Sequence, residues 1–405
     1  MPDLAELRDY AGAAAVPPGF EVIRGRARRI RRRRRVRTAA AAVLLVMTGI
    51  FAYAMKPAPV VPPAIPVPAR LGPVVATTPT DLYGLRRPCE RCATEFYASA
   101  DAGRTWQRRV DPAPPDPDGP FAPSLVVLGE HALMWVQTAG GGPLVNGPRP
   151  VTRRWVTLDG GRTWSPRSVS ATPVPAVADG ARAVRCDPEA PASPCMFYAL
   201  DPSDGRFAPL ATQPSGLDPQ WTGSEVNVPI GAGLWAPGLD AATRRPAVSI
   251  SLDGGRTWHE HVFTDGIAAA GSRSGYDKYY PAVAAGSNGV AYVLILHDEG
   301  DDRRVTSYRT TDGGRTWARL GVLGFTFDPG YVTADGAHVV WASTGHGTGR
   351  LMASRGGRDY VPVTLPGFPA ELAAGTPAIL HDAAGRYLVG GWISDDGWKW
   401  RPLGS

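Results

Sequence analysis

Short stretches of alternating apolar and polar residues recur along the chain, and each ends at a nearly identical turn. These stretches are Glu95–Ala98, Arg154–Val156, Ala247–Ile250 and Val305–Tyr308. A period of two is typical of a β-strand with one buried face. A second short strand follows each turn, such as Gln107–Val110 or Ala318–Val322. The pattern predicts a series of β-hairpins, and from Val74 onward we expect no amphipathic helix.

The turns share the motif Ser/Thr-x-Asp-x-Gly-Arg-Thr-Trp, written four times as Ser99–Trp106, Thr157–Trp164, Ser251–Trp258 and Thr310–Trp317. A short acidic side chain can accept hydrogen bonds from the backbone N–H groups of a turn. The glycine supplies a positive φ, and the tryptophan supplies a large apolar surface that can hold the turn against the sheet. We therefore expect structural roles for Asp101, Gly103, Trp106, Asp159, Gly161, Trp164, Asp253, Gly255, Trp258, Asp312, Gly314 and Trp317.

This motif resembles the Asp-box, or bacterial neuraminidase repeat, of sialidases, other glycoside hydrolases and many non-enzymatic β-propellers. The resemblance implies a propeller with the boxes at its periphery, away from any catalytic centre. Sialidase chemistry uses three arginines, a Tyr–Glu pair and an aspartic acid. The first arginine belongs to an Arg-Ile-Pro motif, which neither Arg70–Pro73 nor Arg86–Pro88 matches. The catalytic residues of the family therefore cannot be assigned here.

The spacing of the motif predicts an all-β fold, a seven-bladed β-propeller, with six blades as the alternative. Phe197–Phe207, Ala353–Tyr360 and Ile393–Trp400 are weaker copies that bring the number of repeats to seven. The repeats begin near Val74, Pro123, Pro173, Glu225, Tyr280, Tyr331 and Pro377. The last repeat lacks one strand in this reading. We expect the chain just before or within Val74–Thr78 to supply it and so close the ring.

Small apolar stretches fit the innermost strands, which converge on the axis of a propeller. They are Pro175–Ala178, Pro281–Ala285 and Pro377–Leu380. The stretches Ala132–Val136, Ala291–Leu296 and His338–Trp341 fit the second strands.

The N-terminal part has a different character from the repeats. Residues 1–37 hold eleven arginines and four acidic residues, so the net charge of +6 belongs to this tail and the remainder sums to −1. The balanced remainder gives no general attraction to nucleic acid. Thr38–Met55 contains eighteen uncharged residues, roughly 27 Å as a helix, which is enough to span a bilayer. The arginines before it predict a cytoplasmic N-terminus and an extracellular C-terminal domain.

A cleaved signal peptide is the competing interpretation of Thr38–Met55, because Ala52-Tyr53-Ala54 fits the small-x-small cleavage pattern. The leading region of 37 residues is longer than usual for such a peptide and favours a retained anchor. Residues 56–73 are rich in proline and form a stiff linker in this interpretation. The predicted organisation is a tail (1–37), a transmembrane helix (38–55), a linker (56–73) and a propeller (74–405).

The four cysteines occupy matching places before two of the turns. An external location predicts local disulfides, Cys89–Cys92 and Cys186–Cys195. A zinc site that uses all four is the alternative, although the Cys186–Cys195 spacing is wide for it. His259 and His261 provide two ligands, which do not make a zinc site. We expect no cofactor and no metal.

The best candidate for a ligand-binding segment is Thr264–Pro281, which joins two predicted blades. It contains Arg273, Tyr276, Asp277, Lys278, Tyr279 and Tyr280. Aromatic and charged groups together suit a sugar or a peptide, while the alternative is a surface loop with tyrosines packed on the rim. The acidic residues Asp298, Glu299, Asp301 and Asp302 fit a solvated hairpin tip. The sequence predicts a cell-surface binding or scaffold module for a glycan or protein, with a sialidase-like or other glycoside hydrolase as the alternative.

Overall fold

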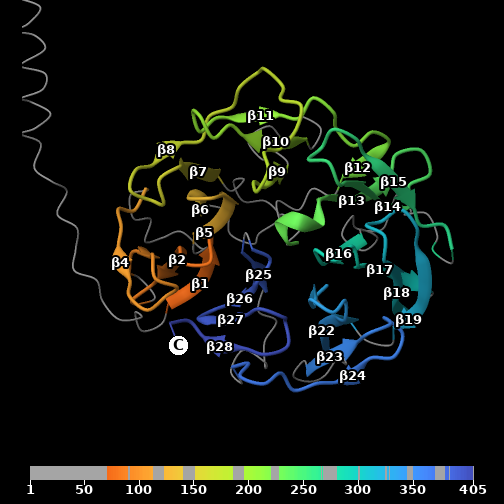
Figure 1. The fold of residues 1–405 in the computed structure, drawn as a ribbon. Coiled ribbons are helices and arrows are strands. Elements are labelled where there is room, and N and C mark those ends of the chain that lie inside the picture. The colour runs from red at the N-terminus through yellow and green to blue at the C-terminus, as the bar shows by residue number, and fades with distance from the viewer. Residues whose placement is uncertain are drawn as a thin grey trace, which may run out of the picture. The chain divides into compact units, whose positions relative to one another are not determined.

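The structure is a computed structural model. It describes residues 71–89, 92–112, 123–139, 151–185, 196–219, 228–265, 267, 281–299, 302–323, 326–327, 329–343, 350–369, 379–382 and 384–404. These residues form seven antiparallel sheets, the blades, numbered here in chain order and arranged as a ring around an axis (Figure 1). The fold is a seven-bladed β-propeller, as the spacing of the motif predicted.

The strands follow one another outward from the axis in most blades. Blade 1 contains β1 (Leu71–Ala76), β2 (Leu82–Arg86), β3 (Glu95–Ser99) and β4 (Gln107–Arg108); blade 2 contains β5 (Ser124–Gly129), β6 (Ala132–Ala139), β7 (Val151–Thr157) and β8 (Ser165–Pro166); blade 3 contains β9 (Ala183–Arg185), β10 (Phe197–Leu200) and β11 (Phe207–Pro209). Blade 4 contains β12 (Leu217–Pro219), the 3₁₀ turn η1 (Ile230–Ala232), β13 (Leu234–Asp240), β14 (Pro246–Ser251) and β15 (His259–Val262).

The remaining blades complete the ring. Blade 5 contains β16 (Pro281–Ala285), β17 (Ala291–Glu299), β18 (Asp302–Thr310) and β19 (Ala318–Leu323); blade 6 contains β20 (Thr326–Phe327), β21 (Tyr331–Val332), β22 (His338–Ser343), β23 (Arg350–Ser354) and β24 (Val361–Pro362); blade 7 contains β25 (Leu380–His381), β26 (Tyr387–Val389), β27 (Trp392–Ser394) and β28 (Arg401–Pro402). In blade 6, β20 and β21 both pair with β22, so together they form one interrupted inner strand. The second strands predicted at Ala132–Val136, Ala291–Leu296 and His338–Trp341 are confirmed.

Each copy of the motif connects the third and fourth strands of its blade, and its polar groups hold the turn. In Thr310–Trp317, one carboxylate oxygen of Asp312 accepts hydrogen bonds from the Thr310 hydroxyl at 2.7 Å and the Thr316 N–H at 3.0 Å. The other oxygen accepts from the Thr316 hydroxyl at 2.6 Å. These bonds hold the pKa of Asp312 well below its usual range, with the Thr316 hydroxyl as the largest cause. The other three copies repeat this pattern.

The same turn is also a contact between blades. A Cβ placed on Gly314 would lie 2.2 Å from Cδ1 of Ile250 in the preceding blade, and Gly161 meets Phe96 in the same way at 2.2 Å. Trp317 packs edge-on against Trp235 and Phe263 of blade 4. The motif therefore does more than shape a hairpin, because its glycine and tryptophan pack against side chains of the preceding blade.

The closure of the ring differs from the expectation that Val74–Thr78 completes the last blade. This stretch belongs largely to β1 of blade 1, and blade 7 has four strands of its own. Its inner strand β25 begins at Leu380, the last residue of the stretch Pro377–Leu380 that fits an innermost strand, and Pro377 and Ala378 lie outside the described residues. The ring closes by side-chain packing instead: Val74, Leu82 and Trp106 of blade 1 pack with Leu388, Ile393 and Leu403 of blade 7.

Blade 3 departs most from the predicted pattern, because no described residue forms its inner strand. β9 begins opposite the end of β10 nearest the motif turn and runs away from it, pairing Ala183 with Ala199 and Arg185 with Phe197. The second strand β6 has the same direction in blade 2, whereas the inner strand β5 has the opposite one. β9 is therefore a second strand, and the prediction that Pro175–Ala178 forms the inner strand is wrong.

The chain before β9 runs along the outer edge of blade 3 and contacts blade 4. Val169 and Val174 form parallel bridges to Phe207 and Leu210 at the outer edge of blade 3. The N–H of Val177 then donates to the carbonyl of Gly254 in the motif turn of blade 4 at 2.8 Å. Blade 3 thus gains contacts at its outer edge, and no described residue forms a strand at its position next to the axis.

Candidate functional site

Arg182 lies at the gap in blade 3 and connects it to three other blades. Its backbone N–H donates to the carbonyl of Leu128 in β5 at 2.9 Å. Its guanidinium donates to the carbonyl of Val228, just before η1, at 2.7 Å, and to the carbonyl of His381 in β25 at 3.1 Å. These partners belong to blades 2, 4 and 7, so the backbone and side chain of one residue connect segments from different blades.

The missing strand explains why an arginine occupies this place. Backbone carbonyls near the axis need hydrogen-bond donors, which are otherwise the N–H groups of neighbouring strands. A guanidinium has five N–H donors on a planar, permanently charged group, so a single side chain can reach two carbonyls at once. Arg182 replaces part of the missing strand by a side-chain link.

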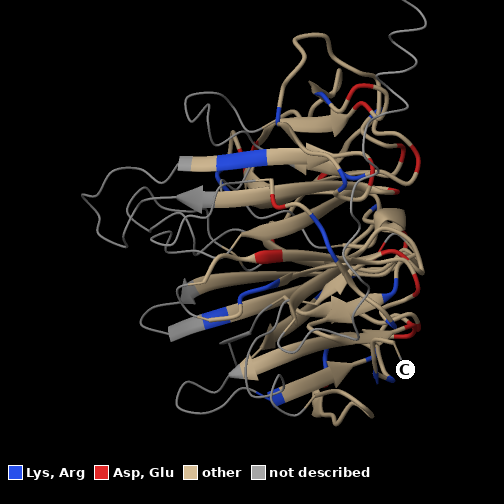
Figure 2. Ribbon diagram, turned by 90° about the vertical axis from the view of Figure 1, so that its left-hand side faces the viewer, with Lys and Arg blue, Asp and Glu red and all other residues tan. Residues whose placement is uncertain are grey.

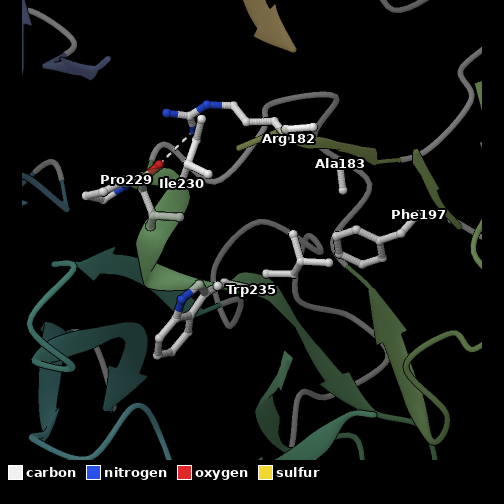
Figure 3. Close-up of a pocket in the computed structure, with 10 residues that line it drawn as sticks. Arg182, Ala183, Phe197, Pro229, Ile230 and Trp235 are labelled. Atoms are coloured by element: carbon white, nitrogen blue, oxygen red, sulfur yellow. Dashed lines mark hydrogen bonds between the residues drawn. The ribbon is translucent and has the colours of Figure 1, made fainter. Parts of the chain in front are cut away.

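A small pocket opens beside Arg182 (Figure 3). Its volume is about 50 Å³, enough for a few water molecules or one small functional group. The lining residues are Ala181, Arg182, Ala183, Phe197, Val228, Pro229, Ile230, Gly233, Leu234 and Trp235. None of these residues is acidic, and the guanidinium is the only charged group among them. The described part of the lining therefore combines one guanidinium with apolar walls.

His381 adds no second charge near this arginine. Its side chain is 4% exposed and packs edge-on against Tyr387. Burial, together with the nearby Arg182 charge, lowers the pKa of His381 to about 3, so the imidazole is neutral at physiological pH. Neither ring nitrogen has a hydrogen-bond partner within the described part of the chain. The next residue, Asp382, is fully buried and paired with Arg386 at 2.6 Å.

The pocket lies on the same side of the ring as the motif turns. Arg182, Leu128 and His381 all lie at the ends of their strands nearest those turns. In the side view, most Asp and Glu residues gather along this face (Figure 2). The motif carboxylates belong to their own turns rather than to the pocket, because their oxygens accept from threonine and serine groups of the same copy.

The segment predicted to bind a ligand cannot be placed against this pocket. Arg273, Tyr276, Asp277, Lys278, Tyr279 and Tyr280 lie outside the described residues, as do Asp301 and the predicted transmembrane segment Thr38–Met55. No helix within the described ranges is long and apolar enough to cross a membrane.

The cysteines are described in part. Cys89 and Cys92 form the predicted disulfide, with their Cα atoms 5.0 Å apart. Cys186 and Cys195 lie outside the described residues. Within the described ranges, no group of three or more His, Cys, Asp or Glu side chains is placed to hold a metal ion.

No pattern in the sequence distinguishes Arg182. The chain contains 40 arginines, so a single one carries no signal. Its partner His381 is 199 residues away, and only the closed ring brings the two together.

Comparisons with known proteins find similar solved structures but no related sequence family. No model of a known protein family matches the chain, and no curated protein matches its sequence. A GH74 xyloglucanase from Xanthomonas campestris has a similar structure, with a TM-score of 0.34, 16% identity, and a match that covers 82% of this chain and 46% of that one. The chain therefore spans less than half the length of that enzyme.

Two other solved structures are similar over most of their length. An uncharacterised protein from Listeria monocytogenes has a TM-score of 0.39 and 9% identity, covering 84% of this chain and 97% of its own. An α-L-arabinanase from Penicillium chrysogenum has a TM-score of 0.31 and 14% identity, covering 75% and 86%. At these identities, the function of the chain must be argued from its own residues.

Proposed function

We propose that the chain is a membrane-anchored, extracytoplasmic propeller that binds a glycan or a protein at the cell surface. The observation that supports it best is the pocket beside Arg182. A permanent charge held between Phe197, Ile230 and Trp235 combines one orienting polar group with apolar walls, as small binding sites do.

The proposed location follows from the N-terminal sequence. The arginine-rich residues 24–37, the uncharged Thr38–Met55 and the proline-rich linker fit a cytoplasmic tail, a single membrane span and a spacer. The Cys89–Cys92 disulfide is consistent with an oxidising compartment outside the cytoplasm. Protease protection of the tail, but not of the propeller, in sealed vesicles would test this orientation. Protection of both parts would contradict it.

We further propose that the repeated turn is the Asp-box and serves the architecture of the propeller. Its carboxylate is used within the turn and its glycine and tryptophan are used between blades, which accounts for the Asp, Gly and Trp of the motif. In this view the boxes bind no ligand themselves.

The test uses the full-length chain in lipid nanodiscs, immobilised through the cytoplasmic end. A glycan array and a pull-down with cell-wall and surface proteins should yield a saturable ligand. Failure of both to give saturable binding would contradict the proposal. The enzymatic alternative, a glycoside hydrolase, predicts turnover of fluorogenic glycosides that one carboxylate substitution abolishes. Such turnover would replace the binding proposal.

A further inference from the structure

The Cys89–Cys92 disulfide lies at the hairpin between β2 and β3, on the face of the ring opposite the motif turns. The two strands are already joined by five backbone residue pairs, the last of which is Arg86 with Glu95. A disulfide constrains the unfolded chain more as its loop lengthens, and this one joins residues only three apart in the sequence. The bond therefore adds little to the stability of a hairpin that the backbone already holds.

The two cysteines differ in their access to solvent. Cys89 is exposed and Cys92 is half-buried. Neither belongs to the apolar clusters that the described residues of blade 1 form with the neighbouring blades. Exchange requires a thiolate to reach one sulfur atom of the disulfide, and exposed disulfides are the ones that react. Cys89 is thus the sulfur that an external thiolate can attack.

The turn itself keeps the two cysteines together. The backbone N–H of Cys92 donates to the carbonyl of Cys89 at 3.1 Å, and Nε of Arg87 donates to the carbonyl of Cys92 at 3.3 Å. None of these bonds uses a sulfur atom, so they remain available when the disulfide opens. Two thiols held at such a short distance react with each other in preference to groups in solution, which allows the bond to form again.

We propose that Cys89 and Cys92 are a redox-active pair that exchanges its disulfide with a dithiol protein outside the cytoplasm. A thiolate of that protein attacks Sγ of Cys89, forms a mixed disulfide and releases Cys92 as a thiolate. The second thiolate of the partner then attacks the partner's own sulfur in the mixed disulfide and releases Cys89. The partner leaves as a disulfide, and its two electrons and two protons remain on Cys89 and Cys92. The inference goes beyond the proposed binding function and takes from it only the location.

The first test is reduction of the folded, full-length chain in lipid nanodiscs by glutathione. Free thiols are labelled with a maleimide and located by peptide mapping in a mass spectrometer. Structural disulfides of external proteins resist glutathione, whereas Cys89 and Cys92 should become labelled while the circular dichroism spectrum stays unchanged. Reduction should lower the melting temperature by less than about 5 °C, because the loop that the bond closes is short.

The second test separates the roles of the two sulfur atoms and of the partner. Cys92→Ser and Cys89→Ser are matched in size and leave the exposed and the half-buried thiol, respectively. Cys92→Ser should form a mixed disulfide with oxidised glutathione at least about tenfold faster than Cys89→Ser. Reduced thioredoxin, the dithiol protein used as a probe, should reduce the wild-type pair at least about tenfold faster than the same concentration of glutathione, because its second thiol resolves the mixed disulfide.

Four results would overturn the inference: a pair that stays oxidised until the chain unfolds, a larger loss of melting temperature on reduction, equal or reversed rates for the two serine variants, or equal rates with thioredoxin and glutathione. The first two would show that the bond serves the fold. Failure here can be separated from failure of the proposed function, because none of these measurements uses a glycan or a protein ligand. A ligand that binds saturably to a chain whose disulfide resists reduction would leave the binding function intact.

Discussion

Gly314→Ala should be among the most damaging small substitutions in this chain. Gly314 has a φ of +90°, a conformation that costs an ordinary residue roughly 1–2 kcal/mol. The added methyl group would also lie 2.2 Å from Cδ1 of Ile250 and 3.5 Å from the ring of Trp235. Overpacking of a filled core costs about 1–3 kcal/mol. Together these effects predict a loss of about 2–5 kcal/mol in the free energy of unfolding.

Gly180→Ala is the matched control for the backbone contribution. Gly180 has a φ of +72°, and a Cβ at this position would meet no atom within 4 Å. Its substitution should therefore cost only the roughly 1–2 kcal/mol of the conformation. The difference between the two variants measures the contact between blades 4 and 5.

Equilibrium unfolding in urea, followed by tryptophan fluorescence in one detergent, provides the two free energies. Ile250→Val removes the Cδ1 atom and should cost about 0.5–1.5 kcal/mol alone. Combined with Gly314→Ala it should cost less than the sum of the two, because the clash is relieved. Equal losses for Gly314→Ala and Gly180→Ala, or strict additivity with Ile250→Val, would refute the close-approach explanation.

Three further predictions concern other parts of the ring. His381→Leu should raise the free energy of unfolding by about 1–3 kcal/mol at pH 7, because it removes a buried ring with no hydrogen-bond partner among the described residues. It should also reduce the loss of wild-type stability below pH 6.5, where the unfolded chain binds a proton that the folded state, with a pKa of about 3, refuses. Urea midpoints at pH 7 and pH 5 measure both effects. The control His338→Leu should lower the free energy of unfolding, because that ring is hydrogen-bonded to Tyr360 and Pro329. A His381→Leu variant that is less stable than wild type would contradict the prediction. Asp159→Asn should cost about 1 kcal/mol through weaker bonds to Thr157 and Thr163, measured as a lower urea midpoint at pH 7. The difference from wild type should shrink as the pH falls below the ordinary carboxyl range, because the pKa of Asp159 is lowered in the folded chain and the unfolded chain takes up the proton first. An unchanged midpoint at pH 7 would count against the prediction. Truncation after Pro402 removes Leu403 from the seam between blades 7 and 1 and should cost about 2–5 kcal/mol in the same assay, so a truncated chain of full stability would show that the seam does not need it.

The parts of the fold that could be predicted are those that depend on interactions between residues close together in the sequence. The motif hairpins depend on bonds between residues at most four apart, such as Thr310, Asp312 and Thr316, so each copy can be recognised alone. The Cys89–Cys92 disulfide is local for the same reason. Strand identity was predictable wherever an alternating stretch ended at such a turn.

The strands at the centre of the ring could not be predicted, because they depend on contacts between segments that are distant in the sequence. Pro175–Ala178 and Pro281–Ala285 have nearly the same composition, yet only the second forms an inner strand. The first is held by the carbonyl of Gly254 in the next blade. No local pattern distinguishes them, since the difference depends on a partner 77 residues away in the sequence.

The link at Arg182 lies where no described residue forms the inner strand of blade 3. A strand in the inner position of blade 3 would use its backbone to bond both β9 and the axis-facing carbonyls. Arg182 takes over the carbonyls of Val228 and His381 but supplies nothing to the edge of β9. The side chain of Arg182 therefore connects blade 3 to blades 4 and 7 through bonds that backbone strands make elsewhere near the axis.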